Sequence, residues 1–380
     1  MRAASPRPPA EASGSNGRSP QLSPPEPAPA APTLERAHVD TNQKAVATPA
    51  TAGTGAVGEH PEPADRQRVK HDGPLRTAVV VNPARVEGLD ELRATIEETL
   101  AAAGWPVPLW FETTPEDPGA GQARQAVAEG AEVVFVSGGD GTVRSCVQGL
   151  AGSEAALAVL PAGTGNLLAT NLGLPDDPTE GVRLAVDRGR HLLDIGEVDG
   201  QAFAVMAGMG FDAKLLEDAS TTLKARVGSL AYVLSALKHL RDRPMRVQIQ
   251  IDDDPPLRRR ARTVVVGNVG RLQGGVRLLA DAEPDNGQLD VAILAPRHLT
   301  DWVALAWGIL RRHEHVPRME VLRGSRITIT SDRDQPCQLD GDVIDPRRVL
   351  AATVRPAALW LCVYQPDRSP DLAEGSPNKR

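Results

Sequence analysis

The chain has 380 residues and a formal net charge of -7. This balance excludes the strongly basic surface on which bulk nucleic-acid binding depends. Three widely spaced cysteines exclude a disulfide framework and a CxxC zinc site, and no apolar run is long enough for a signal peptide or a membrane span. We therefore expect a cytoplasmic protein that binds no nucleic acid.

Residues 1–75 are expected to be disordered. They contain 13 of the 33 prolines and no Phe, Trp or Tyr. Such a segment cannot bury enough apolar surface to offset the entropy lost on ordering. Residues 367–380 are expected to form a polar tail. The part between them is long enough for two domains of ordinary size.

Residues 76–190 alternate between strand-like and helix-like patterns. Buried strands are predicted at 77–81, 107–111, 133–137 and 157–161, and helices at 89–104, 121–130, 142–151 and from about 166. Strands that alternate with helices through short loops predict an α/β domain with a doubly wound parallel sheet.

Residues 191–366 contain many strands and few helices. Strands are predicted at 192–198, 202–208, 246–251, 263–268, 289–295, 327–331 and 349–354, and helices at about 213–241 and 299–312. This order predicts a mostly antiparallel β-sandwich or barrel. The basic run RRRAR at 258–262 follows three aspartates at 252–254 and is expected to be a solvated hairpin.

Two glycine-rich turns carry the main functional signal. SGGDGT (137–142) follows the third strand, PAGTGN (161–166) follows the fourth, and each opens a helix. Glycine lets the backbone approach a ligand closely, and a helix N-terminus suits phosphate. Two such turns on neighbouring strands can converge on one ligand at the carboxyl ends of the sheet.

Asp140 lies inside the first turn, and neither turn contains a lysine. A carboxylate beside a polyphosphate is unfavourable unless a divalent cation joins the two or the carboxyl group is protonated. A Mg²⁺ ion that links Asp140 to nucleotide phosphates through water would explain the residue. An Asx turn with a purely structural role is the alternative.

GGDGT followed by a GTGN turn resembles the diacylglycerol kinase catalytic family, which includes bacterial lipid kinases and sphingosine kinases. Further segments resemble this family in order: NPARVEG at 82–88, ETTPEDPG at 112–119, GMGFDAKL at 208–215 with GSLAY at 228–232, DAEPDNGQLDVAIL at 281–294 and QLDGDVI at 338–344. The resemblance implies an ATP- and Mg²⁺-dependent kinase that phosphorylates a lipid hydroxyl.

The resemblance also assigns nucleotide-binding residues. Thr113 is chosen over Thr114 by its spacing to the glycine turn. The residues implied to hold ATP are Asn82, Thr113, Gly138, Gly139, Asp140, Gly141, Thr142, Val143, Arg144, Gly163, Thr164, Gly165 and Asn166.

Asp342 stands where the family has a glutamate proposed as general base. Aspartate keeps the carboxylate but is shorter by one methylene, so a rearranged loop or help from Asp340 is expected. A plain Asp-Gly-Asp turn is the alternative. The catalytic residues implied are therefore Asp342 and Asp140.

A structural Mg²⁺ site is implied at 283–288, where bacterial members of the family use an aspartate and backbone carbonyls. The candidate ligands are Glu283, Asp285, Asn286 and Gln288. Asn286 occupies the aspartate position, and the loss of one charge is expected to weaken the site.

The implied substrate is a lipid alcohol, either diacylglycerol, a long-chain base or another lipid. Peripheral membrane contact is expected, either through the helix at 301–312 or through the basic residues of 213–241, although an ordinary buried helix and a solvated face are the alternatives. A homodimer through an exposed strand edge is possible. Two other functions stay open: a regulatory protein of the same fold that binds nucleotide or lipid without turnover, and an NAD kinase.

Overall fold

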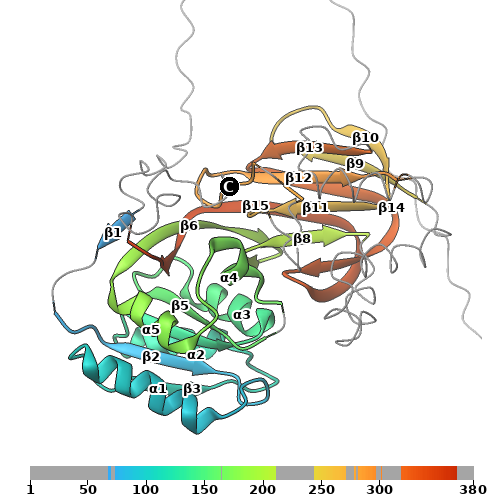
Figure 1. Ribbon diagram of the computed structural model, residues 1–380. Coiled ribbons are helices and arrows are strands. Elements are labelled where there is room, and N and C mark those ends of the chain that lie inside the picture. Colours follow the sequence, from blue (N-terminus) through green and yellow to red (C-terminus); the bar gives the residue numbers. More distant parts are fainter. Residues whose placement is uncertain are drawn as a thin grey trace, which may run out of the picture. The chain divides into compact units, whose positions relative to one another are not determined.

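The computed structural model describes residues 67–69, 73–163, 165–210, 244–270, 278–279, 281–296, 301 and 318–365. Within these residues all fifteen strands belong to one hydrogen-bonded sheet. The sheet has a parallel part covered by helices and an antiparallel part that folds into a β-sandwich (Figure 1). Both parts of the predicted fold class are thus confirmed.

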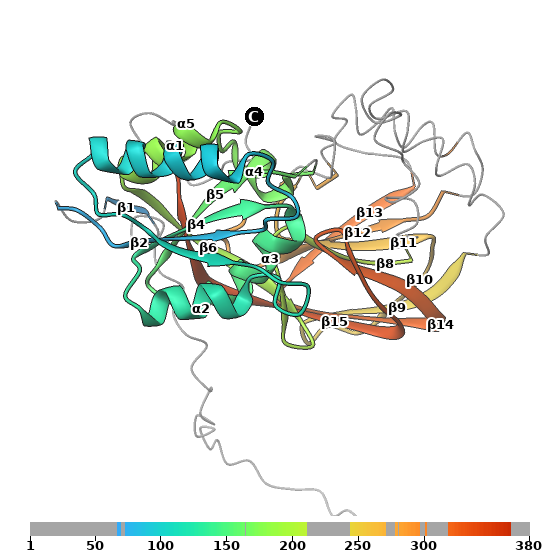
Figure 2. The same cartoon turned by 90° about the horizontal axis from the view of Figure 1, so that it is seen from below.

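The parallel part has the strand order β5-β4-β2-β3. Its strands are β2 (Thr77–Val81), β3 (Leu109–Glu112), β4 (Val133–Gly138) and β5 (Ala156–Pro161). Its helices are α1 (Leu89–Ala102), α2 (Ala120–Ala128), α3 (Asp140–Leu150), α4 (Leu167–Leu172) and α5 (Pro178–Val186). Figure 2 shows α1 and α5 on one face of these strands and α2 and α3 on the other. Two covered faces explain why every residue of β2 and β4 is buried.

Local chemistry sets two helix boundaries that differ from the predicted ones. α3 begins at Asp140, two residues earlier than predicted, and this places a carboxylate in the first turn, where the helix dipole favours it. The helix predicted from about 166 is two helices, because Gly173 ends α4 in a left-handed conformation (φ 64°). The Asp177 side chain accepts a hydrogen bond from the Glu180 N–H and caps α5.

The antiparallel part encloses a second core of Val, Ile and Leu side chains, between β9 and β14 on one side and β11 and β12 on the other. Its strands are β6 (Gly189–Val198), β7 (Gln201–Phe203), β8 (Met206–Met209), β9 (Met245–Ile251), β10 (Leu257–Ala261), β11 (Thr263–Gly267), β12 (Leu289–Leu294), β13 (Met319–Gly324), β14 (Arg326–Leu339) and β15 (Asp342–Cys362). β13 was not predicted. The hairpin predicted around 258–262 is the β9–β10 pair.

β15 connects the two parts of the sheet. It pairs antiparallel with β14 and β6, and near its end Trp360 and Leu361 pair parallel with Ala156 and Leu157 of β5. The end of the second predicted domain therefore returns to the first sheet. Asp342, at the start of the same strand, lies on the side of the sandwich that meets α3.

A short strand also forms inside the segment expected to be disordered. β1 (Gln67–Val69) pairs antiparallel with β6, and Leu75 is buried. Residues 1–66, the predicted helix at 213–241, the predicted tail at 367–380 and, except for residue 301, the predicted helix at 299–312 lie outside the described residues. Within the described part of the chain, no helix is long and apolar enough to cross a membrane.

Candidate functional site

The two glycine-rich turns meet at the carboxyl end of the parallel sheet. β4 and β5 are neighbours, with Gly138 opposite Pro161, and the Ala162 N–H donates to the Gly138 carbonyl oxygen at 3.2 Å. A Cβ added to Gly163 would lie 2.9 Å from the Gly139 Cα. The turns therefore form one continuous stretch of backbone, and glycine at 163 is required for their approach.

Asp140 joins the two turns through its side chain. Its Oδ1 accepts the Leu167 N–H at 2.6 Å, so the carboxylate at the start of α3 also holds the start of α4. Burial raises the pKa of Asp140 above its usual range, the Leu167 N–H opposes this shift, and the nearby Asp342 charge adds to it. Two carboxylates therefore lie close together beside the glycine backbone, which is an arrangement suited to a cation.

The predicted residues of the first two strands lie at the same edge. The Asn82 Nδ2 donates to Thr142 Oγ1 at 3.1 Å, and its Oδ1 accepts the Ala84 N–H at 3.1 Å. Thr113 extends β3, is buried, and donates its N–H to the Val81 carbonyl oxygen. The ends of β2, β3, β4 and β5 thus bring these residues to one edge of the sheet, while their role in holding ATP stays a prediction.

The remaining members of the second turn lie beside the first. Asn166 precedes α4 in a left-handed conformation (φ 45°), and its Oδ1 accepts the Gly163 N–H at 3.2 Å. Gly165 is part of the same turn, while Thr164 lies outside the described residues.

Asp342 reaches this edge from the sandwich. Its Oδ2 accepts hydrogen bonds from Arg144 of α3, at 3.1 Å from Nε and 3.0 Å from Nη2. A Cβ added to Gly141 would lie 3.0 Å from the same oxygen. The Asp342 side chain keeps 43% exposure. The shorter aspartate therefore contacts the first turn, with one oxygen bound to arginine and the side chain open to solvent.

Asp340 does not share this position. Its carboxylate is buried and accepts the N–H groups of Ala204, Val205 and Met206 at 2.8 to 2.9 Å. Burial raises the pKa of Asp340 to about 6, against the effect of these three donors. The expectation that Asp340 helps Asp342 is therefore wrong, because its two oxygens hold the bend between β7 and β8.

An open hollow of about 340 Å³ lies at the start of β15. It is lined by Gln201, Val343, Ile344, Asp345, Pro346 and Arg347, five of which directly follow Asp342 in the chain. Val343 is exposed there.

The loop at 283–288 does not fit the implied metal site. Asp285 Oδ2 lies 2.9 Å from Nε2 of His191, a side chain that is 1% exposed. Asn286 Oδ1 accepts the Gln288 N–H, and the Pro284 carbonyl oxygen accepts the Asp194 N–H. No group of three His, Cys, Asp or Glu side chains among the described residues could hold a metal ion.

Asp285 Oδ2, Asn286 Oδ1 and the Pro284 carbonyl oxygen are thus used by the protein's own hydrogen bonds. Asp194 and His191 were missed by the sequence analysis. The sequence did contain a signal for Asp194, because it is a charged residue inside the apolar strand LLDIG. A carboxylate that is buried in such a strand needs a hydrogen-bond or ion-pair partner.

Comparison with known proteins identifies both parts of the fold. Residues 76–198 match the diacylglycerol kinase catalytic domain, and residues 205–363 match the "YegS C-terminal NAD kinase beta sandwich-like domain". The diacylglycerol kinase of Bacillus subtilis (strain 168) is 30% identical over 233 residues, which are 59% of this chain and 76% of the relative.

Two further similarities cover more of the chain. The "Probable lipid kinase YegS-like" of Pseudomonas fluorescens (strain Pf-5) is 32% identical over 298 residues, 74% of this chain and 93% of that protein. A crystal structure of a diacylglycerol kinase from Bacillus anthracis str. Sterne shares the fold with a TM-score of 0.58 at 20% identity, and the match covers 76% of this chain and 96% of that one.

Proposed function

The chain belongs to the diacylglycerol kinase catalytic-domain family, and from this premise we propose that it is a lipid kinase that uses ATP and Mg²⁺. It transfers the γ-phosphate of ATP to a lipid hydroxyl. The observation that carries the proposal is the meeting of the two glycine turns with Asp140 and Asp342 at one edge of the sheet.

The glycine turns bind the nucleotide phosphates in this proposal. The backbone from Gly138 to Gly141 leads into the N-terminus of α3, whose free N–H groups suit an anion. Asn82 and Thr142 hold each other by a hydrogen bond and fix the entrance to the same helix. Gly163 lets the second turn complete the surface, and Arg144 supplies the positive charge that a lysine supplies in other phosphate loops.

The residues at this edge fit a Mg²⁺ ion. Asp140 presents a carboxylate beside the glycine backbone, and Mg²⁺ is usually held by one or two carboxylates together with substrate phosphates and water. Bound there, the ion would neutralise the charge of the phosphates and of Asp140, while Asp342 stays free to act as a base. The loop at 283–288 has no part in this proposal.

Asp342 takes the proton of the acceptor. The lipid oxygen forms a bond to the γ-phosphorus, the bond from that phosphorus to the bridging oxygen breaks, and ADP leaves. The acceptor proton moves to the Asp342 carboxylate. Arg144 occupies Oδ2, so the proposal assigns the proton to Oδ1.

The hollow at the start of β15 is the proposed path of the lipid. Val343, Ile344 and Pro346 offer apolar surface there, in the residues that follow Asp342, whose carboxylate must meet the hydroxyl. Such a substrate resides in a membrane, so the enzyme contacts the membrane peripherally while it binds the lipid.

Transfer of labelled phosphate tests the proposal. The full chain is mixed with radiolabelled ATP, Mg²⁺ and detergent micelles that contain diacylglycerol, a long-chain base or another lipid alcohol. We expect one acceptor to gain label. Asp342→Asn should lower kcat about 100- to 10,000-fold, the usual range for loss of a general base, while ATP binding persists. Asp140→Asn should weaken binding of magnesium nucleotide.

Asp334→Asn is the matched control, because Asp334 is exposed and pairs only with exposed Arg348 among the described residues. ATP binding without transfer to any lipid would favour the regulatory protein instead. Turnover that survives Asp342→Asn would overturn the assignment of the base.

A further inference from the structure

Three arginines lie on one face of the sandwich: Arg258 and Arg260 of the basic run at 258–262, and Arg246 of β9. In the β9–β10 hairpin Arg258 lies opposite Gln248, and Arg260 lies opposite Arg246. β9 alternates between buried and exposed residues, and the buried ones line the second core. The three arginines are exposed on the opposite side, and we call them the arginine face.

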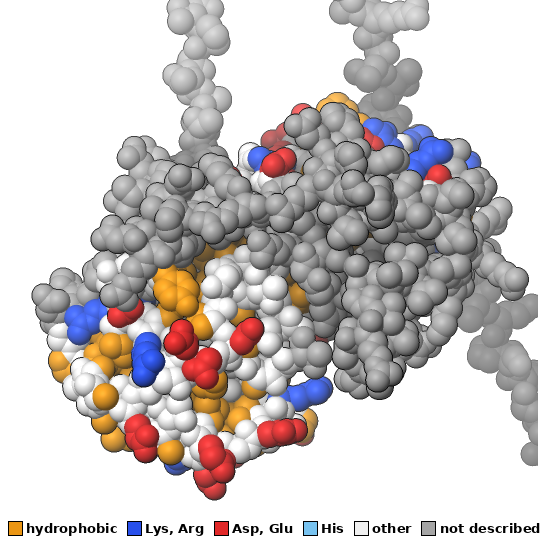
Figure 3. All heavy atoms as spheres, viewed as in Figure 1, with side chains coloured by type: hydrophobic (Ala, Val, Ile, Leu, Met, Phe, Trp, Pro, Cys, Tyr) orange, Lys and Arg blue, Asp and Glu red, His pale blue; other side chains and the backbone are white. Residues whose placement is uncertain are grey.

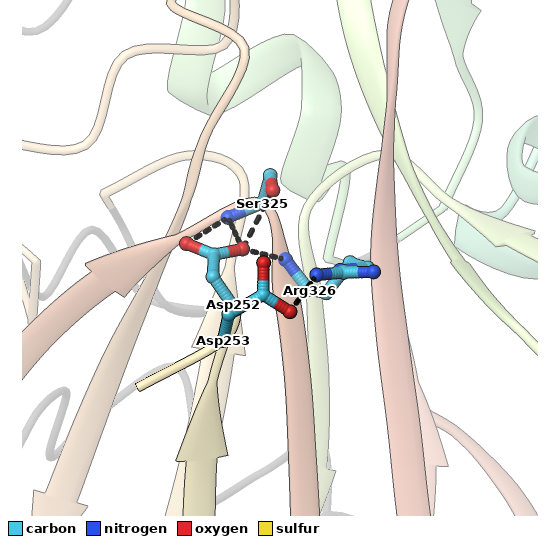
Figure 4. A network of polar contacts seen from close by, with 4 residues as sticks. All are labelled: Asp252, Asp253, Ser325 and Arg326. Atoms are coloured by element: carbon cyan, nitrogen blue, oxygen red, sulfur yellow. Dashed lines mark hydrogen bonds and ion pairs between the residues drawn. The ribbon is translucent and has the colours of Figure 1, made fainter. Parts of the chain in front are cut away.

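Two of the three neighbouring aspartates are paired with β14 and not with the arginine face, and the third, Asp254, is exposed. Asp252 accepts hydrogen bonds from the Ser325 hydroxyl and from the Ser325 and Arg326 N–H groups, and Asp253 pairs with the Arg326 side chain (Figure 4). Burial alone would raise the pKa of Asp252, but these hydrogen bonds hold it below its usual value. Both aspartates thus fix the turn after β9 to the start of β14.

The nearby acidic side chains on other strands are paired elsewhere. Arg259 points to the other side of β10 and pairs with Glu320 of β13 at 2.7 Å. At the rim Asp332 accepts the Arg246 backbone N–H and pairs with Arg333. Among the described residues no ion pair involves the side chains of the arginine face. Arginine side chains gather over this hairpin at the upper right of Figure 3.

This arrangement costs stability. Arg246 and Arg260 are directly opposite on antiparallel strands, where like charges repel. β10 pairs only with β9 among the described strands, and charges on an edge strand do prevent edge-to-edge aggregation. Charges of alternating sign would serve that purpose without the repulsion. Three positive charges that have no ion pair among the described residues, in a chain of net charge -7, therefore indicate an anionic partner.

One of the rows that cross the sheet is uncharged beyond its arginine, whereas Asp332 contacts the backbone of Arg246 in the next row. From Arg258 one row runs through Gln248 and Thr330 to Val349, each directly opposite the next. Val349 is 48% exposed. The face thus has arginines at one edge and an exposed apolar side chain on β15, the strand that begins at Asp342.

We propose that the outer face of β10, β9, β14 and β15 docks on an anionic lipid membrane. The three guanidinium groups bind lipid phosphates, for which arginine has a matching pair of donors, and Val349 enters the interface. Membrane docking would bring the active site to the membrane that holds the lipid substrate. Only this role of the docking face rests on the proposed function.

Co-sedimentation of the full chain with vesicles tests the docking face directly. Vesicles of phosphatidylcholine alone are compared with vesicles that also contain phosphatidylglycerol. Each arginine near an anionic surface strengthens binding about fivefold, so Arg258→Gln/Arg260→Gln should weaken binding to the anionic vesicles about 30-fold. The matched control is Arg93→Gln/Arg124→Gln, which removes the same charge from α1 and α2 and should keep most of the binding.

Salt and folding provide two internal checks. The difference between wild type and Arg258→Gln/Arg260→Gln should shrink as salt rises, because salt screens surface charge. Arg246→Gln relieves the repulsion with Arg260, so it should weaken vesicle binding while it keeps or raises the midpoint of thermal unfolding.

Equal binding to neutral and anionic vesicles would overturn the proposal. An equal loss in the α1–α2 control would also overturn it, because net charge would then be the cause. Kinase activity on lipid in detergent micelles tests the proposed function separately from the docking face. This activity should be unchanged in Arg258→Gln/Arg260→Gln. If the protein binds anionic vesicles but has no kinase activity, the proposed function is wrong and the docking proposal still holds.

Discussion

Asp194 provides the sharpest test of how the 283–288 loop is held. The side chain lies in β6 and is almost fully buried. Its Oδ2 accepts the Gly287 N–H at 2.5 Å, and its Oδ1 accepts the Ala357 N–H at 2.7 Å. Its own N–H donates to the Pro284 carbonyl oxygen. One carboxylate therefore connects β6, the loop and the bend in β15.

Asp194→Asn keeps the shape of the side chain but leaves only one acceptor atom. The amide NH₂ then faces a buried backbone N–H, and the remaining hydrogen bond loses its negative charge. A hydrogen bond to a charged group contributes about 1.5–3 kcal/mol, and an unsatisfied buried donor costs about 1–3 kcal/mol. Relief of the buried charge offsets part of this loss, so we expect the free energy of unfolding to fall by about 2–4 kcal/mol.

Equilibrium unfolding of the full chain in urea measures this change. The expected fall corresponds to a midpoint lower by roughly 1 M urea for a protein of this size. Asp281→Asn is the control, because Asp281 is exposed just before the loop, and its effect should stay within about 0.5 kcal/mol. Since Asp285, Asn286 and Pro284 already use an oxygen in hydrogen bonds, Mg²⁺ or a chelator should not change the stability of this segment in the absence of nucleotide.

Two results would refute this reasoning. Asp194→Asn with wild-type stability would show that the two hydrogen bonds do not hold the loop. Stabilisation by Mg²⁺ that is present in wild type and lost in Asp285→Asn would show that the loop binds a metal after all.

Two further variants test the candidate site. Gly163→Ala adds a Cβ only 2.9 Å from the Gly139 Cα, so the turns must separate; calorimetry should show ATP affinity lower by about tenfold or more, and unchanged affinity would contradict the role of the close approach. Asp340 has a folded pKa of about 6, above the value of about 3.9 in an unfolded chain. Its contribution to stability is therefore present below about pH 4 and is lost as pH rises through about 6, which amounts to roughly 3 kcal/mol. Relative to Asp340→Asn, which does not titrate, wild type should lose this amount between about pH 4 and pH 7 in urea unfolding, and a constant difference would contradict it.

The sequence by itself determined the elements and the main motif. Strand and helix patterns at 77–161 depend on local periodicity, and the structure reproduces their order. The glycine turns were readable for the same reason: they follow buried strands and open helices, and parallel neighbours place such turns at one edge. One glycine turn follows β4 and the other follows β5. Because these two strands are parallel neighbours, the two turns must meet at the same edge of the sheet.

Only the tertiary structure decided what the acidic residues do. Asp340 and Asp342 are two positions apart in similar sequence, yet one accepts three buried N–H groups and the other contacts Arg144 from a partly exposed position. Asp285, a candidate metal ligand, pairs with His191, which lies 94 residues away in the chain. The role of a carboxylate depends on which donors and charges surround it, and those come from strands distant in sequence. Local pattern fixes where a strand begins and which face is buried, but it contains no record of the partner that the fold brings to each polar atom.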